Sequence, residues 1–378
     1  MSKNNFKFYF DIMSNTKYYK EHFEKCKNED YVRDICNTKL TKANSRDEYI
    51  NVVQKSSLWL KLRSMSHGTA SSLGKYIPGS KWTTEETLNQ EWEDKLKKKP
   101  LEKSQTMEAH MSWGNEYEDL ALVCFAEKFN KCVTQVGTIR VDFQDIHDNY
   151  TLYFPDLPEL VKKETGIKNN YHLLISPDGI VGKREKKNIK YNKMSKKIVG
   201  MLEIKCISPF HHEENFRGNL VWAEDMEKRQ WYTNDDIPYV YLIQMCLQAL
   251  SGIIELNMTF NDIMYFERWS PKGFSVFELP FYNIFKIGTL ANELYFSILH
   301  RSKTQKDFKA YPLNSEEEKV SQTIQYEIQE LFSKLKHSYT SIETTYPYHE
   351  IFQNYYIENQ HKEFNMNPNH KESSKCLI

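Results

Sequence analysis

The apolar run over residues 198–207 (IVGMLEIKCI) constrains the fold of this chain more than any other stretch, because its only charges are Glu203 and Lys205. A run of apolar and β-branched residues of this length predicts a buried strand. Side chains alternate between the two faces of a strand, so both charges lie on one face. A buried carboxylate and a buried ammonium are costly unless they are paired, hydrogen-bonded or bound to a metal. The strand therefore predicts a polar site inside the fold.

A third charged group follows another apolar segment. Residues 172–176 (HLLIS) lead into the turn Ser176-Pro177-Asp178-Gly179, and a neighbouring strand would bring Asp178 beside Glu203. Two carboxylates and a lysine suit phosphodiester hydrolysis with Mg²⁺, a hard ion that prefers oxygen ligands and activates water. The lysine adds a compact positive charge. The alternative is an ordinary turn aspartate next to a partly exposed Glu-Lys pair.

Composition sets wider limits. The 378 residues allow one large domain or two ordinary ones. The 51 basic and 51 acidic residues cancel, so nucleic-acid binding would depend on local patches. The 7 cysteines are scattered and no secretory leader is evident, which favours a reducing intracellular compartment. No apolar run approaches the length of a membrane span, so we expect no membrane association.

Two motifs precede the central segment. Residues 59–71 read as a helix, a turn at Gly68 and a second helix capped near Thr69 or Ser71. Arg63 beside such a helix start is suited to bind a phosphate, although a surface arginine and a structural cap are the plain alternative. Further on, residues 116–119 (EYED) precede the apolar stretch 120–126, which predicts a largely buried helix with these acids in its first turn. They would either point into the protein or complement the helix dipole.

Between these motifs and Glu203, residues 133–141 alternate like one strand, and residues 142–170 are expected to form an irregular insertion. The chain from Asp178 to Glu203 predicts a basic hairpin or flap. It carries a single acid, Glu185, against eight basic residues: Lys183, Arg184, Lys186, Lys187, Lys190, Lys193, Lys196 and Lys197. Such a loop could contact backbone phosphates or simply be solvated.

Beyond the central segment, residues 237–252 predict a helix with Pro238 in its first turn and a stop at Ser251-Gly252. Gln244 and Gln248 lie four residues apart on one face of this apolar helix, so they either bond to nearby backbone or line the site. Two strands are expected over 262–279, helices over 281–300 and 316–337, and a disordered polar tail from about residue 358.

Four motifs therefore occur in one order, and this order resembles the phage lambda exonuclease family, also called YqaJ-like viral recombinases, within the PD-(D/E)xK nuclease superfamily. They are Trp59/Arg63 with Thr69-Ala70-Ser71, Trp113-Gly114 with Tyr117-Glu118, Ser176-Pro177-Asp178-Gly179 with Glu203-Ile204-Lys205-Cys206, and Tyr241 with Gln244. The resemblance covers roughly residues 56–290. It implies Glu118, Asp178 and Glu203 as metal ligands, Asp178, Glu203, Lys205 and Gln244 as catalytic residues, and Arg63, Ser71 and Ser176 as ligands of a 5′ phosphate.

We therefore expect an α/β fold with a restriction-endonuclease-like core, in which helices flank a mixed central β-sheet. The core would span residues 56–300, between an N-terminal extension (1–55) and a C-terminal extension (301–378). The expected activity is that of a Mg²⁺-dependent deoxyribonuclease, with Mn²⁺ as a substitute, that digests double-stranded DNA from its 5′ end. Lys186, Lys187 and Lys190 would contact the DNA backbone.

The biological setting implied by the resemblance is viral-type DNA replication, recombination and repair, in the host cytoplasm or nucleus. Expected partners are double-stranded DNA, a single-strand annealing protein and further copies of the chain in a trimer. Two alternatives stay open: an endonuclease or RecB-type nuclease of the same fold, and a catalytically silent scaffold that binds DNA ends. The scattered cysteines disfavour the iron-sulfur branch of the RecB-type group.

Overall fold

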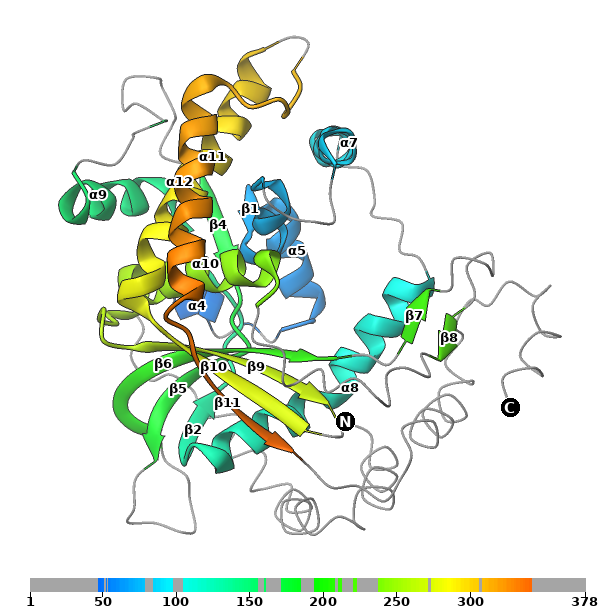
Figure 1. Ribbon diagram of the computed structural model, residues 1–378, viewed down its shortest axis with the longest axis vertical. Helices are drawn as coiled ribbons and strands as arrows, with labels where there is room; N and C mark the ends of the chain where they lie inside the picture. Colours follow the sequence, from blue (N-terminus) through cyan, green and yellow to red (C-terminus); the bar gives the residue numbers. More distant parts are fainter. Residues whose placement is uncertain are drawn as a thin grey trace, which may run out of the picture.

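A mixed six-stranded sheet forms the centre of the molecule (Figure 1). The computed structural model describes residues 47–50, 52, 54–78, 84–97, 105–155, 160, 171–184, 194–207, 210–212, 220–222, 237–270, 273–305 and 308–341. The strand order is β11-β10-β9-β6-β5-β2. The strands are β2 (Lys131–Thr134), β5 (Gly179–Arg184), β6 (Met194–Cys206), β9 (Ile263–Ser270), β10 (Gly273–Pro280) and β11 (Lys336–Ser341). Only β6 and β9 pair in parallel, and all the other neighbours in this sheet are antiparallel.

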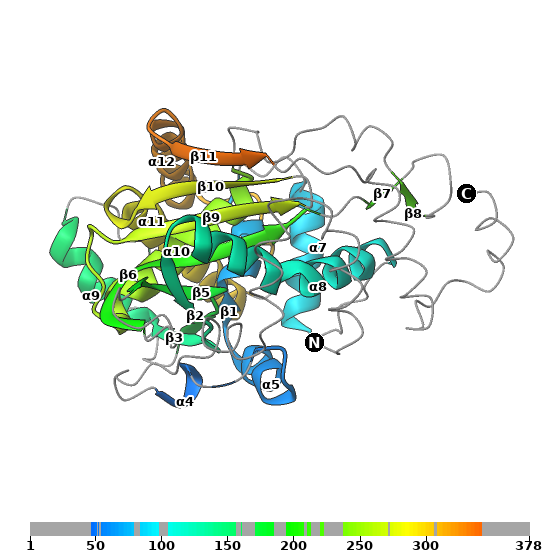
Figure 2. The same cartoon turned by 90° about the horizontal axis from the view of Figure 1, so that it is seen from below.

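Helices cover both faces of this sheet (Figure 2). Helix α8 (Gln105–Lys128) lies on one face, where the Tyr117 ring stacks on Trp269 of β9 with centroids 5.2 Å apart. Helices α10 (Tyr239–Leu256) and α11 (Phe281–Thr304) lie on the other face, where Tyr241 packs on Phe266. Residues 266 and 269 of β9 point to opposite faces, as strand periodicity requires. The expectation of a mixed sheet flanked by helices is confirmed.

A second sheet has the order β1-β4-β3 and brings two distant motifs together. Its strands are β1 (Gly68–Thr69), β3 (Ile139–Asp142) and β4 (His172–Ile175). Because β1 and β4 are parallel, with Thr69 opposite Leu174, the residues that follow each strand emerge at the same end. Those residues are Ser71 after β1 and Ser176 after β4.

The remaining elements surround these sheets. The helices are α4 (Asp47–Ile50), α5 (Ser57–Met65), α6 (Ala70–Leu73), α7 (Glu85–Leu96), α9 (Phe143–Tyr153) and α12 (Ser315–Phe332), together with a short 3-10 helix, η1 (Gly74–Tyr76). Strands β7 (Phe210–His212) and β8 (Leu220–Trp222) form a separate antiparallel pair.

Several expectations about local structure need correction. Residues 133–141 form two strands in different sheets, β2 and β3, since the chain leaves the large sheet after residue 134. Within the expected irregular insertion, residues 143–153 form α9, whose Phe143 packs on Phe296 of α11. Helix α8 begins at Gln105 rather than near residue 116, so Glu118 lies in the middle of the helix and not in its first turn. The same helix contains Trp113 and Gly114 of the second motif.

Helix α10 continues past the predicted stop. It ends at Leu256, where Asn257 adopts a left-handed conformation with φ 53° and its N–H bonds to the Gly252 carbonyl. Every residue from Leu242 to Gly252 is buried. By length and apolar composition α10 could cross a membrane, but core helices share these properties. It packs on α11 and on β6 and β9 of the large sheet, and this packing explains its apolar surface.

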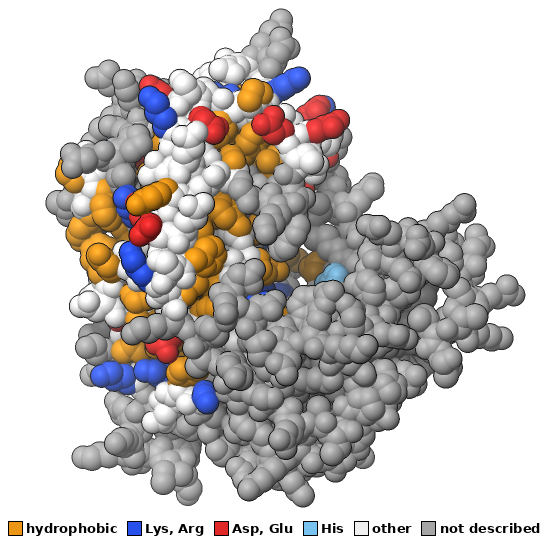
Figure 3. Space-filling model, in the orientation of Figure 1, with side chains coloured by type: hydrophobic (Ala, Val, Ile, Leu, Met, Phe, Trp, Pro, Cys, Tyr) orange, Lys and Arg blue, Asp and Glu red, His pale blue; other side chains and the backbone are white. Residues whose placement is uncertain are grey.

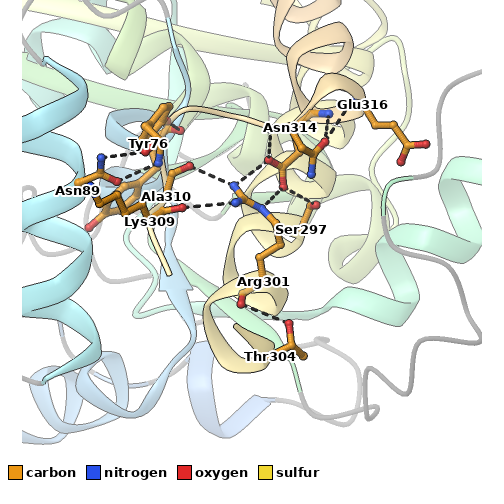
Figure 4. A network of polar contacts seen from close by, with 11 residues as sticks. Tyr76, Asn89, Ser297, Arg301, Thr304, Lys309, Ala310, Asn314 and Glu316 are labelled. Carbon is orange, nitrogen blue, oxygen red and sulfur yellow. Dashed lines mark hydrogen bonds and ion pairs between the residues drawn. The ribbon is translucent and has the colours of Figure 1, made fainter. Parts of the chain in front are cut away.

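The first part of the predicted C-terminal extension packs on the same core. Strand β11 adds to the edge of the large sheet beside β10, and α12 packs along α11. Arg301 of α11 binds the buried carboxylate of Glu317 with both Nε (2.9 Å) and Nη2 (2.8 Å), and Ser297 donates to the same carboxylate (Figure 4). The guanidinium also donates to the carbonyls of Lys309 and Ala310. A bidentate pair of this kind fixes the two helices in one orientation.

The face shown in Figure 3 carries described side chains of both charges, together with apolar ones. Acidic side chains gather at one end of this face in Figure 3. The first turn of α12 holds the exposed acids Glu316 and Glu318 and the buried Glu317. Such acids favour a helix N-terminus. The described residues on this face therefore form no broad basic surface.

Candidate active site

Glu203 lies at the centre of the site, on β6 under helix α10. Its side chain is only 1% exposed, and three donors hold its carboxylate. Lys205 and Gln244 donate to Oε1, the latter at 2.6 Å, and Gln248 donates to Oε2 at 2.6 Å. The predicted single face for Glu203 and Lys205 is confirmed. Of the two alternatives for the glutamines, the structure shows that both line the site.

Asp178 follows β4 in the turn that leads into β5. Its Oδ2 accepts a hydrogen bond of 2.6 Å from the backbone N–H of Ile204, the residue between Glu203 and Lys205. Gly179 makes this turn feasible, because a Cβ atom there would lie 2.2 Å from Cγ1 of Val133 on the neighbouring strand. The juxtaposition of Asp178 and Glu203 expected from the sequence is therefore present.

The electrostatics of the three acids are coupled. Burial raises the pKa of Asp178 well above its usual range, and the charges of Glu203 and Glu118 raise it further. Burial lowers the pKa of Lys205, but the Glu203 and Asp178 carboxylates outweigh this effect and the net shift is upward. Lys205 thus stays protonated, and its ammonium also lies 5.0 Å from the centre of the Tyr241 ring.

Glu118 reaches this group from the middle of α8. Its side chain is 20% exposed, and its Oε2 forms an ion pair of 2.8 Å with Lys55 Nζ. The neighbouring acid Asp119 has its pKa raised by burial and by the Glu118 charge. For Glu116, the side chain lies outside the described part of the structure. Glu118 of α8 therefore belongs to the site, because its charge raises the pKa of Asp178.

The three residues assigned to phosphate binding lie together around the Trp59 side chain. The Arg63 guanidinium stacks 4.3 Å above the Trp59 ring and donates to Ser71 Oγ at 3.1 Å. The indole N–H of Trp59 donates to Ser176 Oγ at 3.3 Å and to the Gly137 carbonyl at 3.1 Å. Thr69, not Ser71, caps α6. Ser71 is exposed and its hydroxyl faces Arg63.

This cluster is close enough to the acids to interact with them. Burial lowers the pKa of Arg63, while the charge of Glu203 raises it. The guanidinium is therefore partly desolvated and lies within electrostatic reach of the acidic group. Such an arginine binds an anionic ligand more strongly than one in bulk water does.

The basic loop can be followed only at its ends. Strands β5 and β6 pair in antiparallel fashion, with Arg184 opposite Met194, so the predicted hairpin is confirmed. Lys186, Lys187, Lys190 and Lys193 lie outside the described residues. Their contact with DNA stays a prediction.

Sequence reasoning missed two residues that hold the site together. The Gln54 side chain donates to the carbonyls of Val136 (2.6 Å) and Pro177 (2.9 Å), which ties the chain before α5 to the Asp178 turn. Lys55 pairs with Glu118. Both lie in the segment assigned to an N-terminal extension, and a polar stretch of this kind carries no periodic signal that distinguishes a site residue from a surface one.

The donor set has the chemistry of a hard-cation site. Three carboxylates interact, and the raised pKa of Asp178 is a cost that a bound cation would offset. In the arrangement seen here, protein donors hold the acids: Lys205 and the two amides on Glu203, and Lys55 on Glu118. Among the described residues, no three His, Cys, Asp or Glu side chains converge closely enough to complete a metal cage.

Comparison with protein families gives one match. The model of the YqaJ-like viral recombinase domain matches residues 58–252, slightly more than half of the 378 residues. The chain belongs to this family, which confirms the resemblance stated from the sequence. The matched range contains α5 except its first residue, strands β5 and β6, and most of α10. No curated protein and no solved structure matches the chain. Membership of this family indicates a nuclease and recombination function.

Proposed function

We propose that this chain is a Mg²⁺-dependent deoxyribonuclease that removes nucleotides from the 5′ end of double-stranded DNA, built on a restriction-endonuclease-like core. One observation carries the proposal. The buried Glu203 carboxylate is held by Lys205 and Gln244, and Asp178 binds the N–H of the residue between Glu203 and Lys205. If Glu203 and Lys205 formed only a structural ion pair, the fold would not need a second carboxylate, Asp178, beside them. Its pKa is raised well above the usual range, which is a cost to stability.

Glu118, Asp178 and Glu203 would hold the metal ion, with Mn²⁺ as a substitute for Mg²⁺. A divalent ion in such a site lowers the pKa of the attacking water and offsets the charge that develops on the phosphoryl oxygens. Gln244 and Gln248 orient Glu203 through its two oxygens, because each amide lies one helical turn from the other on the same face of α10.

Lys205 would stabilise the transition state directly. Its ammonium has three N–H donors, of which one binds Glu203, so the others can reach the scissile phosphate and the attacking water. Because its pKa is raised, it remains a cation throughout the pH range in which the enzyme would act. It supplies positive charge where negative charge develops, in a partly water-excluded site.

Arg63, Ser71 and Ser176 would bind the terminal 5′ phosphate. Trp59 holds two of them, through ring stacking on Arg63 and its indole N–H on Ser176, and Arg63 in turn donates to Ser71. A terminal phosphate carries more negative charge and more free oxygens than an internal one, so this pocket favours strand ends.

The partners and setting follow from this activity as further proposals. The protein would act on double-stranded DNA inside an infected cell, pass the exposed strand to a single-strand annealing protein, and assemble as a trimer around its substrate. Lys186, Lys187 and Lys190 would contact the duplex backbone ahead of the site.

The test is incubation of linear and closed circular duplex DNA with Mg²⁺, using labels on the 5′ or the 3′ ends. The proposal expects mononucleotides from 5′ ends, no loss of circles, and at least a 100-fold lower rate in Glu203→Gln. Glu278→Gln, an exposed acid on β10, is the matched control and should leave the rate unchanged. Cleavage of circles would favour the endonuclease, and DNA binding without any cleavage would favour the scaffold.

A further inference from the structure

Lys55 has a backbone conformation that a lysine rarely adopts. Its φ is 65°, and among the described residues other than glycine only Asn130 and Asn257 share a positive φ. Asn257 directly follows the last residue of α10, and Asn130 lies two residues after the last residue of α8; at such helix ends a short polar side chain tolerates this conformation. Lys55 follows no helix end and precedes Ser56, the N-cap of α5. An outlier that glycine would occupy without strain is a reason to look for a function of the side chain.

Neighbouring contacts hold this strained residue beside the active site. Gln54 donates to the carbonyls of Val136 and Pro177, and the second of these belongs to the residue that precedes Asp178. On the other side, Ser56 accepts the N–H of Trp59 at 3.2 Å. The Lys55 backbone is therefore fixed between the Asp178 turn and the phosphate pocket, and only its side chain is free to move.

The ammonium of Lys55 occupies an oxygen of Glu118. The Nζ–Oε2 distance is 2.8 Å, and the lysine side chain is 49% exposed. The Glu118 charge contributes to the raised pKa of Asp178. The Glu118 side chain is 20% exposed, compared with 1% for Glu203, so Lys55 is bound to the more exposed of these two glutamates. The other lysine of the site, Lys205, is bound to the more buried one, Glu203. Lys205 is fixed by its surroundings, whereas the long stem of Lys55 can turn toward solvent.

We propose that Lys55 is a DNA-phosphate ligand that Glu118 holds until the metal ion takes the carboxylate. The proposal rests on the nuclease function above. A divalent ion bound to the Glu118 carboxylate would repel the Lys55 ammonium and compete with it for Oε2, so metal binding would weaken this ion pair and release Lys55. Lys55 pairs with Glu118 and directly precedes the N-cap of α5, the helix that carries Arg63, so the released ammonium would bind a backbone phosphate of the entering strand there. Metal and DNA therefore strengthen each other's binding, and this coupling is reciprocal.

The test compares the wild type with Lys55→Met, which keeps the stem but removes the charge, and Lys55→Gly, which also removes the strain. Lys334→Met, from an exposed ion pair with Glu330, is the control. Mn²⁺ binding to the protein alone is measured by calorimetry. Binding of a short end-labelled duplex is measured by anisotropy with and without Ca²⁺, over a range of salt concentrations.

The expected result has three parts. Lys55→Met binds Mn²⁺ a few-fold more tightly, because Glu118 is free. It binds DNA a few-fold more weakly when Ca²⁺ is present, and the slope of log K against log salt falls by roughly 0.9, the value for one phosphate contact. Lys55→Gly behaves in the same way but melts at or above the wild-type temperature, which excludes misfolding as the cause.

Two outcomes would overturn the proposal, and they differ. If the wild type binds Mn²⁺ but Lys55→Met matches it in metal affinity and salt slope, Lys55 is an ordinary surface lysine and the nuclease function stands. If the wild type binds no Mn²⁺, and Glu203→Gln changes nothing, the metal-dependent function fails together with the proposal for Lys55.

Discussion

At the scale of single residues, the site combines charges that the fold does not neutralise fully. Asp178 accepts only one backbone hydrogen bond to Oδ2 among the described residues, and it lies near two other acids. Its charge therefore lowers the stability of the folded chain. Such a cost is common where selection acts on chemistry rather than on stability.

Asp178→Asn should separate activity from stability. The amide oxygen can still accept the Ile204 N–H, so the turn keeps its hydrogen bond while the repulsion disappears. With a chelator present, we expect the variant to be more stable than the wild type at neutral pH, by about 1 kcal/mol for each unit by which the pKa is raised. Its rate on linear DNA with Mg²⁺ should fall roughly 100-fold or more. Thermal melting and initial rates measure the two effects, and a rate within a few-fold of the wild type would remove Asp178 from the metal site.

Glu267 allows the effect of burial on a carboxyl pKa to be tested at a residue that is not a proposed metal ligand. This carboxyl lies on β9, is 0% exposed, and neither oxygen has a hydrogen-bond partner among the described residues. Burial raises its pKa well above the usual range. The native state therefore keeps the proton while the unfolded state loses it above about pH 4.3, so stability falls as the pH rises beyond that point.

We expect Glu267→Gln to remove this dependence. The glutamine does not titrate, so the variant should match the wild type in stability near pH 4 and exceed it at pH 8. The difference should be about 1 kcal/mol for each unit of raised pKa. Urea unfolding at several pH values measures it, with Glu278→Gln on β10 as an exposed control. Equal stability curves for wild type and variant would mean that Glu267 ionises in the folded state.

At the scale of helices and strands, the sequence predicted what depends on local pattern. The alternation around Glu203 and the spacing of Gln244 and Gln248 placed these side chains on one face of β6 and one face of α10, as observed. The start of α8 was predicted wrongly because residues 105–115 lack the apolar periodicity that the later turns show. The switch of the chain between two sheets after residue 134 depends on long-range pairing, which no local pattern contains.

Predicting the phosphate pocket likewise requires both the local sequence pattern and the long-range pairing of strands. Arg63 and Ser71 are eight residues apart and could be linked from the sequence, but Ser176 reaches them only through the parallel pairing of β1 and β4. Trp59 connects Arg63 and Ser176 by its ring and its N–H, and Arg63 binds Ser71. Because α5 provides both Trp59 and Arg63, the position of this helix decides whether the pocket exists.

Arg63→Ala should therefore act on end recognition alone. A truncated side chain cannot bind a terminal phosphate bidentately, while the acids around Asp178 remain in place. We expect the wild type to degrade 5′-phosphorylated duplex faster than 5′-hydroxyl duplex, and the variant to lose roughly tenfold or more on the phosphorylated substrate only. Lys61→Ala, an exposed residue of the same helix, is the control. A wild type that does not distinguish the two ends would argue against an exonuclease that is anchored by this pocket.

At the scale of the whole molecule, the balanced charge limits how DNA can be held. With 51 basic and 51 acidic residues, long-range attraction is weak and binding depends on where the lysines lie. The two strands that carry the site, β5 and β6, are joined by the segment that contains Lys186, Lys187, Lys190 and Lys193. The pairing of these strands fixes both ends of the segment to the sheet that positions Glu203. Basic residues there are tethered to the strand that carries Glu203, which a patch elsewhere on the surface would not be.

Replacing these four lysines with glutamine should weaken duplex binding and flatten its salt dependence. Each lost phosphate contact removes roughly 0.9 from the slope of log K against log salt, so losing all four would reduce the slope by about 3.6. Phosphate contacts carry no sequence information, so preference among duplex sequences should not change. Anisotropy titrations with Ca²⁺ over a range of salt concentrations measure the slope.

A matched variant replaces four exposed lysines elsewhere in the chain: Lys97, Lys128, Lys319 and Lys334. It has the same net charge, so a flattened slope in the first variant alone assigns the contacts to this segment. If both variants show the wild-type slope, the segment is solvated and the duplex is held by the Arg63 pocket and the acidic site.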